Sequence, residues 1–391
     1  MAEAYLVGGV RTPVGRYGGA LASVRADDLA ALVVGEAVRR AGVDPSLVDE
    51  VVLGAANQAG EDNRNVARMA VLLAGLPVTV SAYTVNRLCA SGLTAIANAA
   101  RAVKAGEADV VVAGGVESMT RAPWVMAKPG TPWAKPGEVH DTALGWRFVN
   151  PRHDGEHTIT LGQTAERVAA LDGITREESD AFGLQSQERA AKAIANGAFD
   201  AELVPVPTTK GDVTVDETPR ATTMERLAAL RPAFAADGVV TAGTSSPLSD
   251  GASAVVVASE DAVRRLGLVP RARVVTGAAA GVAPQLMGLG PVPATEKALS
   301  RAGWLVADLD AVELNEAFAV QVLASARRLG LDPATLNADG GAIALGHPLG
   351  SSGARLVVTL LGRLEREQGR RGLATMCVGV GQGASLLVER V

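Results

Sequence analysis

The chain has few aromatic residues and very few cysteines. Aromatic side chains make up 3% of its 391 residues, so its core must consist of aliphatic side chains, alanine and glycine. Such residues let backbones pack closely, as layered folds of helices and sheets require. The two cysteines form no Cys-x-x-Cys pair and have no metal-ligand spacing. This argues against both a disulfide framework and a structural zinc site.

The chain also lacks an excess of positive charge, long apolar runs and a leader-like N-terminus. Its net charge is −5 at pH 7, so no overall basic field favours nucleic acid or an anionic membrane. No apolar run is long enough to span a bilayer. Residues 1–7 predict the start of a strand and not a signal peptide. We therefore expect a soluble, cytoplasmic protein that binds neither nucleic acid nor a membrane.

Helix and strand signals alternate at both ends of the chain, which is long enough for two or three domains. Residues 26–40 and 91–105 predict helices, and residues 48–54 and 109–115 predict buried strands. Strands that are apolar throughout and separated by helices indicate a sheet covered on both faces. The fold class is therefore α/β.

The pattern changes between about residues 119 and 248, where Trp, Pro, His and charged residues become frequent. Only residues 175–196 predict a clear helix there, so the segment is expected to be an inserted, loop-rich domain. A surface excursion is one interpretation. We favour a substrate-binding lid, because long loops on compact α/β cores usually carry function.

A repeat at one spacing relates the two ends of the chain. Several matches at the same offset and in the same order indicate two halves of one duplicated fold. Their strand ends are expected to face a shared site. The matches are residues 40–42 with 301–303, Asp49, Val51 and Leu53 with Asp310, Val312 and Leu314, and residues 91–92 with 352–353.

Both cysteines and one of the four histidines lie in glycine-rich turns beside apolar runs. They are Cys89 in residues 86–93, His347 in residues 340–350 and Cys377 in residues 374–383. Nucleophilic acyl chemistry needs a thiolate, a base for its proton and uncovered backbone N–H groups. We expect a helix N-terminus to lower the pKa of Cys89. Taken singly, Cys89 could be a small buried hydrophobe and His347 a turn residue.

Two further segments have open interpretations. The glycines that alternate after Cys377 suit an oxyanion hole, and the alternative is a strand packed tightly against a helix. Asn315 and Glu316 stand between a predicted strand end and a helix start. Polar residues at such a place act either as a helix cap or as groups of a site.

Four segments together resemble the thiolase family. They are Asn-x-x-Cys-x-Ser-Gly around Cys89, Asn-Glu-Ala-Phe at 315–318, Gly-His-Pro around His347 and Cys-x-Gly-x-Gly-x-Gly from Cys377, in the family's order. The resemblance runs from about residue 10 to the C-terminus. It implies a thiolase fold, in which two similar α/β halves form a five-layered αβαβα core with an inserted loop domain. The halves would be residues 1–118 plus 249–270 and residues 271–391, with residues 119–248 as the loop domain that binds CoA.

The resemblance also implies ping-pong acyl transfer, which runs in reverse as a Claisen condensation. Cys89 would attack the 3-keto carbonyl of a 3-oxoacyl-CoA, and His347 would accept the thiol proton. Cys377 would protonate the acetyl-CoA carbanion that leaves. The backbone N–H groups of Cys89 and Gly379 would bind one oxyanion, and His347 with a water held by Asn315 would bind the other.

Coenzyme A is the expected co-substrate, with no tightly bound cofactor, in a homodimer or homotetramer. The resemblance places Arg220 near the adenine and phosphate end of CoA and Ser246 near its pantetheine. No metal site is expected, because His140, His153 and His157 lie near acidic residues without regular ligand spacing.

Three segments bear on the identity of the acyl chain. Thr160 and Leu161 replace the His-Met of many acetoacetyl-CoA-forming thiolases, and residues 244–246 are similar to those of degradative thiolases. The main expectation is therefore cleavage of 3-oxoacyl-CoA, as in fatty acid β-oxidation. Residues 141–151 resemble a stretch in 3-oxoadipyl-CoA thiolases, in which Arg147 or Arg152 could pair with a distal carboxylate. These arginines could instead contact CoA phosphates or solvent.

Other functions remain as alternatives. A biosynthetic acetoacetyl-CoA thiolase and an inactive acyl-CoA-binding relative share the fold, although the second would not need to keep Cys89, His347, Cys377 and Asn315 together. A ketoacyl synthase usually pairs its cysteine with two histidines, whereas this chain offers Cys-His-Cys.

Overall fold

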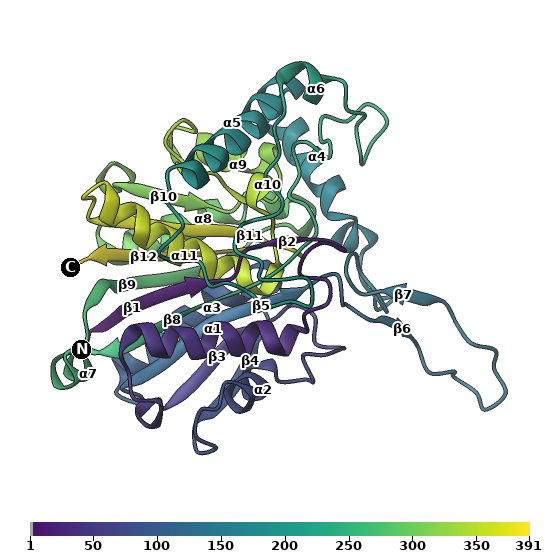
Figure 1. The fold of residues 1–391 in the computed structure, drawn as a ribbon. Helices are drawn as coiled ribbons and strands as arrows, with labels where there is room; N and C mark the ends of the chain where they lie inside the picture. Colours follow the sequence, from purple (N-terminus) through teal and green to yellow (C-terminus); the bar gives the residue numbers. More distant parts are fainter. Residues whose placement is uncertain (1–2) are drawn as a thin grey trace.

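The computed structural model describes residues 3–391, whose main sheet is built from both ends of the chain (Figure 1). In the N-terminal half the strand order is β4-β3-β5-β8-β1, and in the C-terminal half it is β10-β11-β12-β9. The strands are β1 (Ala4–Arg11), β3 (Glu50–Gly54), β4 (Ser81–Val85), β5 (Val110–Ser118), β8 (Ser249–Ser259), β9 (Pro270–Gly281), β10 (Ala311–Leu314), β11 (Arg371–Val378) and β12 (Gln382–Arg390). A short strand, β2 (Gly15–Arg16), pairs with β8.

The helices follow the strands in corresponding order in the two halves. In the N-terminal half they are α1 (Ala26–Ala41), α2 (Val66–Leu73), α3 (Ser91–Ala105) and α7 (Glu260–Leu266). In the C-terminal half they are α8 (Pro291–Ala302), α9 (Ala319–Leu329), α10 (Ala342–Leu345) and α11 (Leu349–Arg366).

The strands present alternate side chains to different helical layers. Val110 and Val112 pack in the apolar cluster that contains α1 and α2. Val111 packs in a second cluster, which holds α3, α11 and Met376 of the C-terminal strands. Leu373 faces α8 and α9 in a third. The five-layered αβαβα architecture is thus confirmed, with one addition: β1 pairs with β9, which joins the two sheets edge to edge.

The duplication is visible in matching hydrogen bonds. The carboxylate of Asp49 accepts from the backbone N–H groups of Asp109 and Val110 at 2.7 and 2.9 Å. Asp310 accepts the same pair of bonds from residues 370 and 371 at 2.7 and 2.8 Å. Each aspartate therefore joins the start of one strand to its parallel neighbour, and the repeat in the sequence corresponds to a repeat in the structure.

Residues 119–248 leave the sheet and return to it. They form the hairpin of β6 (Trp124–Met126) and β7 (Val139–Asp141), which projects from the body (Figure 1), and the helices α4 (Leu161–Asp172), α5 (Arg176–Ala195) and α6 (Met224–Ala228). The sequence predicted α5 but missed α4, which Thr160 and Gln163 begin with a capping box. Ala165 of α4 and Phe182 of α5 pack in the same cluster as α9. These helices therefore share a core with the C-terminal half.

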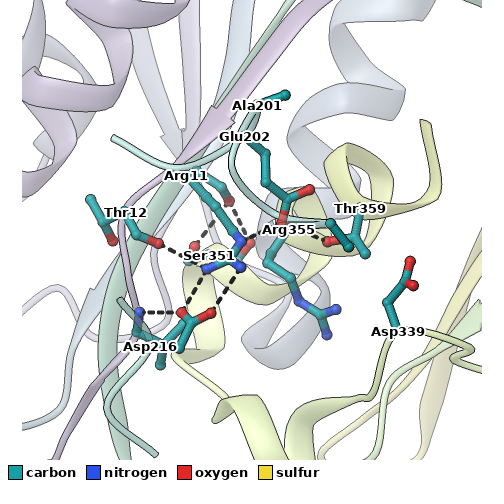
Figure 2. A network of polar contacts seen from close by, with 12 residues as sticks. Arg11, Thr12, Ala201, Glu202, Asp216, Asp339, Ser351, Arg355 and Thr359 are labelled. Atoms are coloured by element: carbon teal, nitrogen blue, oxygen red, sulfur yellow. Dashed lines mark hydrogen bonds and ion pairs between the residues drawn. The ribbon is translucent and has the colours of Figure 1, made fainter. Parts of the chain in front are cut away.

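A buried arginine attaches the end of this segment to the core. Arg11 of β1 binds the carboxylate of Glu202 at 2.5 Å and that of Asp216 at 2.7 and 2.9 Å (Figure 2). Thr359 of α11 donates to Glu202 at 3.2 Å. The two carboxylates hold the guanidinium charged and raise the pKa of Arg11 further, against the effect of burial. The network joins β1, α11 and the inserted segment.

Replacing Arg11 by methionine is expected to destabilise the fold by about 3–5 kcal/mol, because it keeps the volume but leaves two buried carboxylates unpaired. Chemical denaturation of the purified protein measures this loss. Adding Asp216→Asn to the variant should recover part of it. Arg264→Ala is the control, because its ion pairs with Glu260 and Asp261 are exposed and contribute little. Equal losses for Arg11→Met and Arg264→Ala would contradict the prediction.

Candidate active site

Cys89 lies in a short 3-10 turn, Leu88–Ala90, that leads directly into α3. The residue before it, Leu88, has a positive φ of 46°, a backbone conformation that costs energy for a residue with a β-carbon. Arg87 fixes the turn by donating to Thr94 at 3.0 Å and to Gln382 at 3.1 Å. Ser91 donates to the carbonyl of Leu88 at 2.6 Å. The cysteine is therefore held in one orientation by contacts to both halves.

His347 lies between α10 and α11 and is 5% exposed. Its Nδ1 is 2.6 Å from the hydroxyl of Ser352. Its Nε2 is 3.4 Å from Nδ2 of Asn315. Both ring nitrogens therefore have polar partners inside the protein.

The first turns of α3 and α11 cross in contact, which brings the Cys89 and His347 segments together. A β-carbon at Gly92 would lie 2.7 Å from the carbonyl oxygen of Gly350, and one at Gly353 would lie 2.3 Å from the nitrogen of Leu93. Real side chains do not fit at these distances, so both helices need glycine where they cross. This explains why the Ser-Gly pair appears at equivalent places in the two halves.

Cys377 ends β11 and is fully buried. Two residues later, the backbone N–H of Gly379 donates to the sulfur of Cys89. A β-carbon at Gly379 would lie 3.0 Å from the ring of Trp146 and 3.2 Å from Leu88. The glycine-rich segment after Cys377 thus approaches the first thiol, and Trp146 of the inserted segment covers the same point.

Asn315 and Glu316 have different roles, which the sequence left open. Oδ1 of Asn315 is buried and has no hydrogen-bond partner in the described part of the chain, so its amide is available to a site. Glu316 accepts hydrogen bonds from Ser186 at 2.6 Å, from Asn337 at 2.8 Å and from the N–H of Ile343 at 3.1 Å. Glu316 therefore supports the α10 segment that precedes His347.

Glu117, which the sequence analysis missed, connects the turns that carry Cys89 and His347. Its carboxylate accepts from the backbone N–H groups of Ala56, Asn57 and Gly350 at 2.9, 3.0 and 2.8 Å. Gly350 lies in the first turn of α11, and the carbonyl of Ala56 accepts from Asn86 near Cys89 at 2.9 Å. Burial raises the pKa of Glu117 to about 7. The sequence feature that could have identified Glu117 is a single carboxylate near the end of an otherwise apolar strand.

The electrostatics of the resting site differ from the sequence-based expectation. Burial raises the pKa of Cys89 to about 11, despite the N–H groups of Gly379 and Cys89 itself. The prediction of a lowered pKa is therefore wrong for this state. Burial, and secondarily the charge of Arg355, lowers the pKa of His347 to about 3. Burial and the neighbouring Cys89 also raise the pKa of Cys377. The resting site thus holds neutral thiols beside a neutral imidazole.

Of the two residues expected to bind CoA, Ser246 belongs to the loop of residues 241–246 and Arg220 contacts it. Ser246 donates through its backbone N–H and its hydroxyl to the carbonyl of Ala317, at 3.0 and 3.2 Å. It therefore adjoins the Asn315 segment. The guanidinium of Arg220 donates to the carbonyl of Ala242 at 3.0 Å, toward the other end of the loop.

The search for metal and membrane sites covers residues 3–391. Within that range, no three His, Cys, Asp or Glu side chains form a group that could hold a metal ion. No helix in the same range combines the length and the hydropathy needed to cross a membrane.

Two known protein families match this chain, and together they cover both halves of the fold and the segments of Cys89, His347 and Cys377. The family "Thiolase, N-terminal domain" matches residues 4–261, and "Thiolase, C-terminal domain" matches residues 268–390. The chain belongs to the thiolase family, whose members are acyltransferases.

Several named relatives are similar over the full length. The 3-oxoadipyl-CoA/3-oxo-5,6-dehydrosuberyl-CoA thiolase of Escherichia coli K12 is 55% identical, with 100% of each chain covered. The beta-ketoadipyl-CoA thiolase of Pseudomonas aeruginosa is 55% identical, covering 100% of this chain and 99% of its own. The structure of human mitochondrial 3-ketoacyl-CoA thiolase in complex with CoA has a TM-score of 0.94 and 40% identity, with 100% and 99% covered.

The raised pKa of Cys89 predicts how the rate of its alkylation depends on pH. Its alkylation by iodoacetamide should accelerate about tenfold per pH unit between pH 7 and 9 without a plateau, because the thiolate fraction grows in that proportion below the pKa. Stopped-flow or mass-spectrometric measurement of the adduct gives the rate. Cys89→Ser, which retains only the fully buried Cys377, should show no comparable labelling. A plateau below pH 8 would indicate a preformed thiolate–imidazolium pair and contradict the prediction.

Proposed function

We propose that this thiolase cleaves 3-oxoadipyl-CoA with CoA, giving acetyl-CoA and the four-carbon dicarboxylic product succinyl-CoA. The main support is the 55% identity, over the full length, to two relatives named for this substrate. A general 3-oxoacyl-CoA thiolase is the second candidate, favoured by Thr160 and by residues 244–246, as in degradative enzymes. In this structure, however, Thr160 caps α4, which accounts for it without reference to the acyl chain.

The first half-reaction uses Cys89 as the nucleophile. His347 takes the thiol proton at Nε2 while the sulfur attacks the 3-keto carbon. The N–H of Gly379 already donates to the sulfur, so with the N–H of Cys89 it is placed to bind the oxyanion on the attacked carbonyl. The bond between C2 and C3 then breaks, and Cys377 gives its proton to the acetyl-CoA carbanion. His347, with a water held by Asn315, stabilises the thioester enolate.

The second half-reaction reverses the proton transfers. The Cys377 thiolate takes the proton of the incoming CoA thiol, whose sulfur attacks the acyl group on Cys89. The product leaves, and the Cys89 thiolate recovers its proton from His347. Protonating the thiolate restores the neutral pair that burial favours in the resting enzyme.

The inserted segment offers a partner for the distal carboxylate. The indole N–H of Trp146 donates to the carbonyl of Ile159 at 3.1 Å, which holds the ring against Gly379 beside the catalytic thiols. Arg147 follows directly, is partly buried and makes no hydrogen bond or ion pair within residues 3–391. Arg152 is exposed, its backbone N–H donates to Oδ1 of Asn150 at 2.9 Å, and its Nε is 3.5 Å from the same oxygen. Of the two arginines that the sequence singled out, we therefore propose Arg147 as the one that binds the distal carboxylate of the substrate.

Coenzyme A is proposed to bind along the 241–246 loop, with Arg220 near its phosphate end and Ser246 near its pantetheine. The supporting observations are the contacts of both residues with that loop and its neighbour, the Asn315 segment. The division into 1–118 plus 249–270, 119–248 and 271–391, the cytoplasmic location and the homodimer or homotetramer remain predictions from the sequence.

The roles of the two thiols predict separable variants. After incubation with a saturated acyl-CoA, peptide mass spectrometry should find the acyl group on Cys89. Cys377→Ala should still be acylated there but should lose thiolysis of 3-oxoacyl-CoA by several orders of magnitude, because nothing protonates the carbanion. Cys89→Ala should lose both activities. An acyl adduct on Cys377, or near-normal thiolysis by Cys377→Ala, would contradict the assignment.

The substrate assignment predicts a charge-dependent effect at one arginine. Arg147→Gln should lower kcat/KM for 3-oxoadipyl-CoA by about 10- to 100-fold, the effect of losing one hydrogen bond to a charged group. For the uncharged 3-oxohexanoyl-CoA its kcat/KM should change little. Arg152→Gln is the matched control and should leave both values near those of the unmodified enzyme. If the unmodified enzyme prefers 3-oxohexanoyl-CoA, the carboxylate proposal is wrong and the general thiolase remains.

A further inference from the structure

We propose that Ser352 is a positioning residue, which fixes the tautomer of His347 so that Nε2 is free to take the Cys89 proton. The inference deepens the proposed function, because it rests on His347 as the base. It concerns the proton on the ring and does not depend on the identity of the acyl chain.

The hydroxyl of Ser352 has a single hydrogen to donate. We assign that hydrogen to the backbone carbonyl of Pro348, 2.9 Å away, because a carbonyl oxygen can only accept. The oxygen therefore faces His347 Nδ1, 2.6 Å away, with a lone pair. A hydrogen bond at that distance requires the other atom to donate, so the proton of the neutral ring is on Nδ1.

Asn315 accommodates the same tautomer on the other side of the ring. Its side-chain nitrogen, as oriented in this structure, is 3.4 Å from His347 Nε2, which then accepts a hydrogen bond. An amide turned about its axis would bring the unpaired Oδ1 to Nε2 and would suit the opposite tautomer. That tautomer would take the Ser352 hydrogen from Pro348, so the choice of tautomer depends on Ser352.

Burial protects the hydrogen bond between Ser352 and His347 from competing water. His347 is 5% exposed and Ser352 is 1% exposed, so bulk water cannot readily replace the hydroxyl as a partner for Nδ1. A hydroxyl also differs from the carboxylate that often orients a catalytic histidine, because it carries no charge to stabilise an imidazolium. Ser352 therefore determines where the proton sits without making the ring charged at rest. The nitrogen that accepts the thiol proton then becomes a donor to the substrate oxyanion.

The N-terminal half contains a similar serine at the start of a central helix. Ser91 occupies the equivalent place in the N-terminal half, at the start of α3. Its hydroxyl donates to the carbonyl of Leu88 at 2.6 Å and accepts from the backbone N–H of Arg87 at 2.9 Å. In both halves a serine at the start of a central helix bonds back to the turn that carries a reacting residue. In the C-terminal half the donor to that serine is the imidazole itself.

Long-range ¹H–¹⁵N spectra of the histidine-labelled full-length enzyme test the tautomer directly. With four histidines in the chain, the spectrum of His347→Gln identifies the His347 signals. The unmodified enzyme should show Nδ1 protonated and Nε2 unprotonated, and Ser352→Ala should show a loss of this tautomer. Protonation at Nε2 in the unmodified enzyme, or an unchanged tautomer in Ser352→Ala, would overturn the proposal.

Kinetics separate positioning from structural support. Ser352→Ala should lower kcat by about 10- to 100-fold, the effect of removing one hydrogen bond to a ring that becomes charged in the reaction, while the KM for CoA stays within about threefold. Ser352→Cys keeps a weaker acceptor and should lose less. Ser351→Ala is the control, because Ser351 is buried on the same helix and bonds to Ser253 at 2.9 Å, away from the ring. It should keep kcat within about threefold.

The outcomes distinguish this proposal from the function on which it rests. If Ser351→Ala loses as much activity as Ser352→Ala, the effect is structural and the positioning role is rejected. If His347→Gln retains turnover, His347 is not the base and the proposed mechanism fails, whatever the tautomer. If His347→Gln is inactive while Ser352→Ala keeps both the tautomer and kcat, the mechanism stands and the inference about Ser352 fails.

Discussion

The site depends on the contact between the first turns of α3 and α11. Gly92 and Gly353 permit a backbone approach that any β-carbon would block. One helix begins just after Cys89 and the other just after His347, so their crossing brings the proposed nucleophile of one half to the proposed base of the other. Glu117 then joins both turns through backbone N–H groups. The chemistry therefore follows from how closely two duplicated helices pack.

The neutral resting state has a mechanistic meaning. Burial opposes a charge on the Cys89 thiol and on the His347 ring alike. Transfer of the thiol proton to His347 therefore becomes favourable only when a substrate carbonyl is present for the sulfur to attack. Gly379 N–H is already directed at that sulfur. An idle enzyme with a neutral thiol is a weaker target for oxidants and stray electrophiles, because the thiolate is the reactive form.

Much of the fold and the four motif-bearing turns could be predicted from the sequence. The repeat predicted the two halves, because Asp49 and Asp310 make the same strand-joining bonds. Glu117 and Ser352 could not be assigned in this way, because their roles depend on which distant N–H groups or ring atoms they meet. The lowered pKa expected of Cys89 failed for the same reason: a sequence shows the helix start, but the extent of burial is a tertiary property.

The position of β8 has a consequence for how the protein is made. This strand lies between β5 and β1, yet the inserted residues 119–248 separate it from β5 in the chain. On the ribosome, β1, β3, β4 and β5 emerge well before the strand that joins β1 to the others. The pairing of β8 with β5 and β1 joins residues that are far apart in the sequence. Such contacts form slowly, and the edges of β5 and β1 stay unpaired until they do. The nascent chain is therefore vulnerable to aggregation at least until residue 259 has left the exit tunnel, and the other edge of β1 stays unpaired until β9 follows.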